Sequence, residues 1–178
     1  MVESHLETAR MASQDPHSPK PPQSATGDET AAEPFVSGAG GAKAHVLIVD
    51  DSEMNRHVLA AMCELFDCSF EVARDGLEAI EIFATAPFDL ILMDIQMPRM
   101  DGIEATHTIR QASENGRSVP ILAVTANVEP SDVRAYLAMG MDGVVAKPIE
   151  AGRLLEAILS ALKARRGASI TSTRREVG

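Results

Sequence analysis

Residues 91–102 read ILMDIQMPRMDG, the stretch that is most informative about the fold. Together with Leu90 it opens on an apolar run, which is typical of a strand buried on both faces of a parallel sheet. The run ends on the carboxylate of Asp94, and Pro98 and Gly102 then indicate a loop. Ligands of open α/β sheets bind at the carboxyl ends of the strands. We therefore expect Asp94 to lie in a ligand-binding crevice.

Apolar segments of strand length alternate with helical patterns on both sides of this stretch. Helix starts are indicated by Ser52, by Asp75-Gly76, by Asp101 and by Pro130, and Asn115-Gly116 predicts a turn. The alternation favours a parallel sheet with right-handed crossovers and helices on both faces. We predict an α/β fold, a doubly wound (βα)5 flavodoxin-like sheet of order 2-1-3-4-5, with strands at 45–49, 69–73, 89–93, 120–125 and 143–146.

The composition of the 178 residues predicts one folded domain with two flanks. Residues 1–42 are rich in Pro, Gly, Ser and Ala, which predicts a disordered N-terminal tail or linker. The domain is expected at 43–163. Residues 164–178 carry four basic residues and are expected to form a flexible basic tail.

Charge and hydropathy exclude several classes of function. The net charge is −10, which argues against nucleic acid as the main partner because phosphate contacts need Lys and Arg. No apolar run approaches the length of a transmembrane helix. The N-terminus also lacks the pattern of a signal peptide, so we expect a cytoplasmic protein without membrane association. Cys63 and Cys68 are too few for a disulfide framework.

Polar residues follow four of the predicted strands where each one ends. Asp50 and Asp51 follow the first strand, Asp94 ends the third, Thr125 ends the fourth and Lys147 follows the fifth. The carboxyl ends of parallel strands meet at one edge of a sheet, so these side chains are expected to share a small space. An isolated Asp after a strand often serves only as a helix cap, but that role does not explain the whole set.

Three neighbouring carboxylates repel one another unless a cation lies between them. Carboxylate oxygens without His or Cys nearby favour Mg²⁺, held with backbone carbonyls and waters. Asp94 can then attack phosphorus and form an aspartyl phosphate. Lys147 would neutralise charge on the transferring group, and Thr125 can donate its hydroxyl to a phosphoryl oxygen.

These motifs resemble the response-regulator receiver domain of two-component signalling, the CheY-like family. The resemblance extends from about residue 44 to residue 163, and the wording of the motifs is most similar to receivers of hybrid histidine kinases. The matching stretches are 45–51, 92–102, 121–127, 140–143 and 147–148.

The resemblance implies a role for each site residue. Asp94 matches the phosphoacceptor, and Asp50 and Asp51 match the acidic pair that positions Mg²⁺, with Asp51 as the direct ligand. Gln96 matches the position whose backbone carbonyl binds the metal.

Two further roles follow from the resemblance, together with one departure from it. Thr125 matches the switch hydroxyl, and Lys147 matches the phosphate-binding lysine, which is followed by a cis proline in relatives. The departure lies on the fifth strand, where Val144 occupies a position that is often aromatic in the family.

The expected function is that of a receiver in a phosphorelay. A histidine kinase or histidine phosphotransfer protein would supply the phosphoryl group, and the output would be protein–protein contact. One alternative is a receiver-shaped docking module that signals without phosphate, which Val144 favours. Another is a phosphatase with an aspartyl nucleophile, but such enzymes usually carry an acid/base where this chain has Gln96. We therefore expect no enzymatic output.

Overall fold

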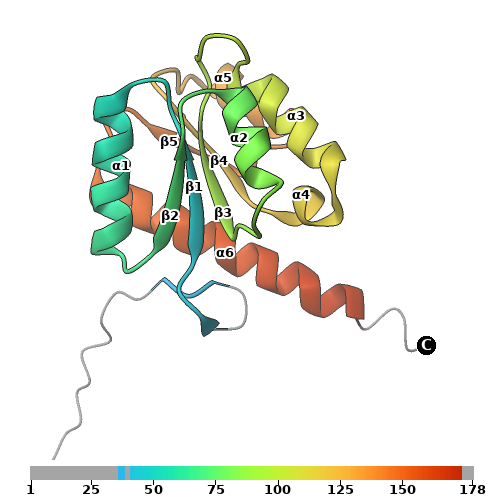
Figure 1. Cartoon of the computed structure of the whole chain (residues 1–178). Helices are drawn as coiled ribbons and strands as arrows, with labels where there is room; N and C mark the ends of the chain where they lie inside the picture. The colour runs from blue at the N-terminus through green and yellow to red at the C-terminus, as the bar shows by residue number, and fades with distance from the viewer. Residues whose placement is uncertain (1–35, 39–40, 174–178) are drawn as a thin grey trace, which may run out of the picture. The chain divides into compact units, whose positions relative to one another are not determined.

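A computed structural model of the chain describes residues 36–38 and 41–173. Its core is a parallel sheet of five strands in the order β2-β1-β3-β4-β5, so the predicted order is confirmed (Figure 1). The strands are β1 (His45–Val49), β2 (Ser69–Ala73), β3 (Leu90–Asp94), β4 (Ile121–Thr125) and β5 (Gly143–Ala146).

Helices connect successive strands, as the alternating pattern predicts. The connection between β3 and β4 contains a short additional helix, α4, where Asn115-Gly116 had indicated a turn. That prediction is wrong because Ser113 caps the segment: its hydroxyl accepts a hydrogen bond from the N–H of Gly116 at 3.0 Å. The helices are α1 (Glu53–Leu65), α2 (Gly76–Phe83), α3 (Gly102–Ala112), α4 (Glu114–Ser118), α5 (Pro130–Ala138) and α6 (Ala151–Thr173).

Side-chain caps begin the helices that follow β1, β2 and β3. The Ser52 hydroxyl accepts from the Asn55 N–H, and Asp75 and Asp101 each accept from two backbone N–H groups of the first turn. Such caps satisfy donors that have no partner within the helix. Each cap lies just beyond a strand or loop end, so it also fixes where the chain leaves the carboxyl edge of the sheet.

The sheet separates two apolar cores. One core packs α1 and α6 against alternate residues of the central strands, such as Ile48 and Leu92. The other packs α2, α3 and α5 against the intervening residues, such as Leu47 and Met93. Because β3 is buried on both faces along its whole length, its apolar run is continuous rather than alternating, and Asp94 is carried rigidly at its end.

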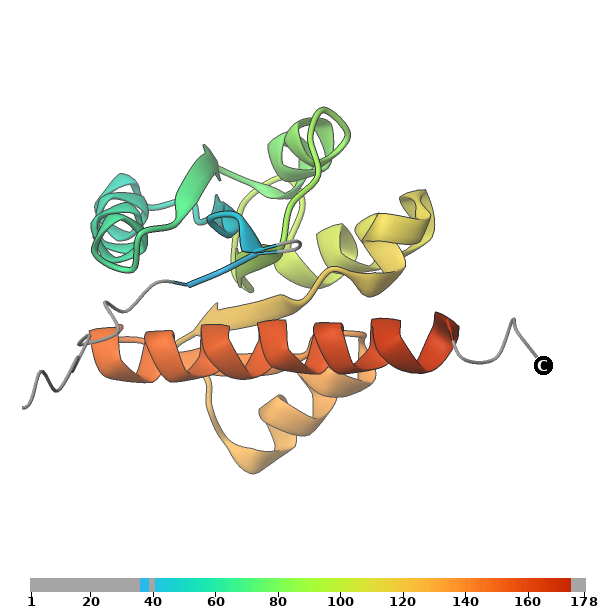
Figure 2. The same cartoon turned by 90° about the horizontal axis from the view of Figure 1, so that it is seen from below.

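The predicted flanks differ from the structure at both ends of the domain. Helix α6 continues to Thr173, so the described part of the expected flexible tail, 164–173, is helical (Figure 2). Gly167 does not end the helix, since an interior glycine costs only about 1 kcal/mol relative to alanine. Residues 174–178 lie outside the described part of the chain.

Part of the expected N-terminal tail also packs on the domain. Val36 is 1% exposed and lies in the core beneath α1 and α6, and its N–H donates to the Phe66 carbonyl at 3.3 Å. The Arg166 guanidinium of α6 donates to the carbonyls of Ser37 and Gly38. An apolar side chain with a place in the core outweighs the loop-like composition around it. Residues 1–35 and 39–40, on which the rest of that prediction falls, are outside the described residues.

Within the described ranges, no helix has the length and apolar character needed to cross a membrane.

Candidate functional site

The strand register brings the predicted acidic residues together. Val49 of β1 pairs with Met93 of β3, so Asp50 and Asp94 lie side by side at the ends of neighbouring strands. Asp50 is fully buried, Asp94 is 5% exposed and Asp51 is exposed. One oxygen of each of these three carboxylates lies within 4.8 Å of the other two. The convergence that the sequence predicts is therefore present.

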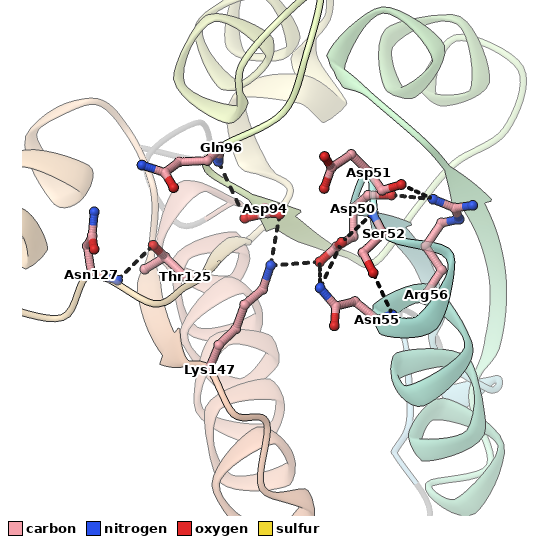
Figure 3. A network of polar contacts seen from close by, with 10 residues as sticks. All are labelled: Asp50, Asp51, Ser52, Asn55, Arg56, Asp94, Gln96, Thr125, Asn127 and Lys147. Carbon is pink, nitrogen blue, oxygen red and sulfur yellow. Dashed lines mark hydrogen bonds and ion pairs between the residues drawn. The ribbon is translucent and has the colours of Figure 1, made fainter.

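Lys147 reaches between two of these carboxylates (Figure 3). Its ammonium lies 2.8 Å from Oδ2 of Asp94 and 2.9 Å from Oδ2 of Asp50. The backbone holds the base of this side chain, because the Lys147 N–H donates to the Thr125 carbonyl at 2.8 Å. The peptide bond between Lys147 and Pro148 is cis, as the resemblance implies.

Burial and charge both perturb the titration of this cluster. Burial raises the pKa of the Asp94 carboxyl, and the neighbouring charge of Asp50 adds to the rise, while the Lys147 ammonium opposes it. Burial alone would lower the pKa of Lys147, but its hydrogen bonds to Asp94 and Asp50 outweigh this and raise it. Lys147 therefore stays charged, and one ammonium faces three carboxylates.

The donor set of the cluster fits a magnesium ion. All three clustered side chains offer hard carboxylate oxygens, and the excess of negative charge over Lys147 would be balanced by a divalent cation. Asp50, Asp51 and Asp94 are the residues that would hold it. Mg²⁺ at such a site supplies charge neutralisation on phosphoryl oxygens and a template for their orientation.

Thr125 and Gln96 flank Asp94. Thr125 is 3% exposed, and its hydroxyl accepts a hydrogen bond from the Asn127 N–H at 3.1 Å. The Gln96 N–H lies 3.4 Å from Oδ1 of Asp94, while its side chain points away from the cluster (Figure 3). Gln96 thus approaches the site through its backbone. Its role as a carbonyl ligand, and that of Thr125 as a switch, stay predictions.

Sequence reasoning missed two residues of α1 that hold the acidic pair in place. The Asn55 amide donates to both oxygens of Asp50, at 3.1 and 3.2 Å. The Arg56 guanidinium donates to the carbonyls of Asp50 and Asp51, at 2.7 and 3.0 Å. The available signal was their position in the first turn after the Ser52 cap, which points their side chains back towards the strand end.

Asn55→Ala is expected to lower the free energy of unfolding by about 1–3 kcal/mol, because the buried Asp50 carboxylate loses two N–H donors. Urea unfolding in metal-free buffer measures this loss. Asn127→Ala is the matched control: this exposed residue serves Thr125 through its backbone, so its effect should stay within about 0.5 kcal/mol. Equal stability of the two variants would contradict the role of Asn55.

Val144 is half-buried and belongs to the same apolar core as Tyr136 of α5. Tyr136 is 6% exposed and is the one buried residue of that helix. The position that is often aromatic in the family is therefore occupied here by a smaller side chain, with the tyrosine supplied from the adjacent helix.

Comparisons with known proteins agree with this geometry. The autoinducer 2 sensor kinase/phosphatase LuxQ of Vibrio harveyi is 40% identical over 114 residues, which are 64% of this chain and 13% of LuxQ. The chain thus spans about an eighth of the length of this curated relative.

Two solved structures are similar in fold and sequence. The receiver domain of sensor histidine kinase PA1611 from Pseudomonas aeruginosa, with a magnesium ion coordinated in its active-site cleft, has a TM-score of 0.63 and 35% identity, covering 68% of this chain and 99% of that one. The receiver domain of Saccharomyces cerevisiae Ssk1, crystallised with the histidine phosphotransfer protein Ypd1, has a TM-score of 0.61 and 32% identity, covering 65% and 86%.

The family profile described as the response regulator receiver domain matches residues 46–159. This match covers more than half of the chain and includes the acidic cluster and Lys147. The chain therefore belongs to the response regulator receiver domain family.

Proposed function

We propose that this chain accepts a phosphoryl group from a phosphohistidine onto Asp94 and signals the modified state through protein–protein contacts. The observation that carries the proposal is the cluster of three carboxylates with the Lys147 ammonium 2.8 Å from Asp94. A nucleophilic carboxylate, a metal-ligating acidic pair and a fixed cation are the parts that in-line phosphoryl transfer needs.

The transfer forms one bond and breaks one. A carboxylate oxygen of Asp94 attacks phosphorus, the P–N bond to the donor histidine breaks, and the imidazole nitrogen takes the electron pair of that bond. Lys147 neutralises charge that develops on the phosphoryl oxygens. Thr125, at the end of the adjacent strand β4, donates its hydroxyl to a phosphoryl oxygen of the product. Asp50 and Asp51, with the Gln96 carbonyl, hold Mg²⁺ throughout.

The proposed donor is a histidine kinase or a histidine phosphotransfer protein. The likeness to the Ssk1 receiver, which was crystallised with Ypd1, and to LuxQ supports this class of partner. Residues 43–163 are the proposed phosphoacceptor unit. The segments before and after it would connect it to other parts of a signalling protein or to its partners.

The test is phosphorylation by a small-molecule donor followed by transfer from protein donors. With acetyl phosphate and Mg²⁺, the intact chain should gain about 80 Da, the mass of one phosphoryl group, and excess EDTA should prevent this gain. A panel of phosphorylated histidine phosphotransfer proteins should then identify a preferred donor. A chain whose mass never changes would contradict the proposal.

Val144 supports a second candidate, a docking module that signals without phosphate. Since this position is not aromatic, the readout of phosphorylation must use another route or be absent. The two candidates differ in partner binding. Equal affinity of an output partner for the wild type, phosphorylated or not, and for Asp94→Asn would favour the docking module.

A further inference from the structure

The loop between β3 and α3 contains a strained turn at Arg99. Arg99 has a φ of 68°, in the left-handed region that residues other than glycine rarely adopt. The Met100 N–H donates to the Pro98 carbonyl at 2.8 Å. A hydrogen bond that spans one residue of positive φ has the form of a γ-turn, which is rare and strained. Such a conformation persists only where the surroundings hold it.

An ion pair to another part of the chain holds this turn. The Arg99 guanidinium donates to Oδ2 of Asp75, whose side chain is only 3% exposed. Oδ1 of the same carboxylate accepts from the N–H groups of Leu77 and Glu78, both at 3.0 Å, and so caps α2. Asp75 is therefore fixed by the helix, and its remaining oxygen is directed to Arg99.

A close backbone contact reinforces the pair. The Gly76 N–H donates to the Met100 carbonyl at 3.2 Å. A Cβ on Gly76 would lie 2.7 Å from Cγ of Met100 and 2.9 Å from its carbonyl oxygen, so only glycine allows the loop to approach α2 this closely. The loop is thus held against the start of α2 on both sides of the Arg99–Asp75 pair.

The same loop begins and ends at the site. Gly102 donates its N–H to the Ile95 carbonyl at 3.0 Å, and a Cβ on Gly102 would lie 2.1 Å from the Asp94 carbonyl oxygen. Between these two anchors lie Gln96 and Arg99. The position of the Gln96 carbonyl is therefore set by the shape of the loop, and Asp51 and Arg99 line one hollow beside it.

We propose that Arg99 is a positioning residue for the metal: its ion pair with Asp75 holds the β3–α3 loop so that the Gln96 carbonyl faces the acidic cluster and completes the Mg²⁺ site. This inference rests on the proposed function, in which Mg²⁺ binds at that cluster. Arg99 itself does not touch the reacting atoms.

The sign of the effect on Mg²⁺ affinity separates positioning from simple electrostatics. Arg99→Ala removes a positive charge near three carboxylates, which by Coulomb attraction alone would tighten Mg²⁺ binding. Positioning predicts the opposite, a loss of roughly tenfold in affinity, of the size seen when residues that support metal ligands are removed. Isothermal titration calorimetry of the full chain with Mg²⁺ measures the change.

Arg74→Ala is the matched control. Arg74 lines the same hollow but pairs with Glu78 instead of Asp75, and its side chain is 70% exposed. This variant loses the same charge without releasing the loop, so its Mg²⁺ affinity should equal or slightly exceed that of the wild type. Arg99→Lys, which keeps the charge, should recover part of the affinity that Arg99→Ala loses.

Hydrogen exchange in metal-free buffer tests the loop independently of the metal. The amides of Gly76 and Gly102 should exchange faster in Arg99→Ala than in the wild type or in Arg74→Ala. Unchanged exchange together with wild-type or tighter Mg²⁺ binding by Arg99→Ala would overturn the role of Arg99 alone. A wild-type chain that binds no Mg²⁺ would overturn the metal site in the proposed function, and this role with it.

Discussion

Asp94→Asn is expected to abolish the gain of about 80 Da that the wild-type chain shows with acetyl phosphate and Mg²⁺. The amide has nearly the shape of the carboxylate but lacks the nucleophilic anion. Lys147 keeps its partner Asp50 at 2.9 Å, and the removal of one of three adjacent negative charges relieves repulsion. We therefore expect the variant to fold and to be at least as stable as the wild type without Mg²⁺. Intact-mass measurement and thermal unfolding check both statements.

Asp101→Asn is the matched control for this experiment. Asp101 lies in the same loop but caps α3, with its oxygen accepting from Ile103 and Glu104 N–H groups at 2.9 and 2.8 Å. Asparagine also caps helices well, so this variant should phosphorylate like the wild type. A phosphoryl gain in Asp94→Asn, or its loss in Asp101→Asn, would mean that the nucleophile has been assigned wrongly.

Lys147→Met is expected to slow phosphorylation by about 10²–10³-fold, the usual effect of removing one group that stabilises developing charge. The long apolar side chain of methionine replaces the stem of the lysine while removing its charge. The rate of mass gain at fixed acetyl phosphate and saturating Mg²⁺ is the measurement. Lys163→Met, at an exposed position on α6, is the control and should leave the rate unchanged.

The same substitution should increase the affinity for Mg²⁺. In the wild type, Lys147 occupies the space between Asp50 and Asp94, so its ammonium competes with a cation for their charge. Without it, the carboxylates have more need of Mg²⁺, and calorimetry should report tighter binding while phosphorylation slows. Opposite changes in the two quantities exclude a merely misfolded variant. A wild-type rate of phosphorylation in Lys147→Met would contradict the role given to Lys147.

The main features of the site could be predicted because they depend on strand ends. Each apolar run has the length of a strand, and the residue after it must emerge at one edge of a parallel sheet. The confirmed order β2-β1-β3-β4-β5 then brings Asp50 and Asp94 onto adjacent strands. No knowledge of side-chain packing was needed for this step.

Helix periodicity was less informative about individual side chains. The pattern in α1 suggested that Val58, Leu59 and Leu65 face the sheet. Leu59 is 1% exposed, but Val58 is 39% and Leu65 66% exposed, and the buried Cys63 belongs to the same face as Leu59. Adjacent apolar residues on a helix differ by 100° in direction, so the sequence pattern left the buried face uncertain by one residue.

The sequence by itself determined the order of strands and helices and the residues that end the strands, because these follow from local periodicity and from the geometry of parallel sheets. Only the tertiary structure decided which side chains hold those residues in place. Arg99 and Asp75 lie 24 residues apart in the chain, and Arg166 contacts a segment 128 residues before it. Contacts of this kind leave no periodic pattern, since they depend on where the folded backbone brings distant residues together.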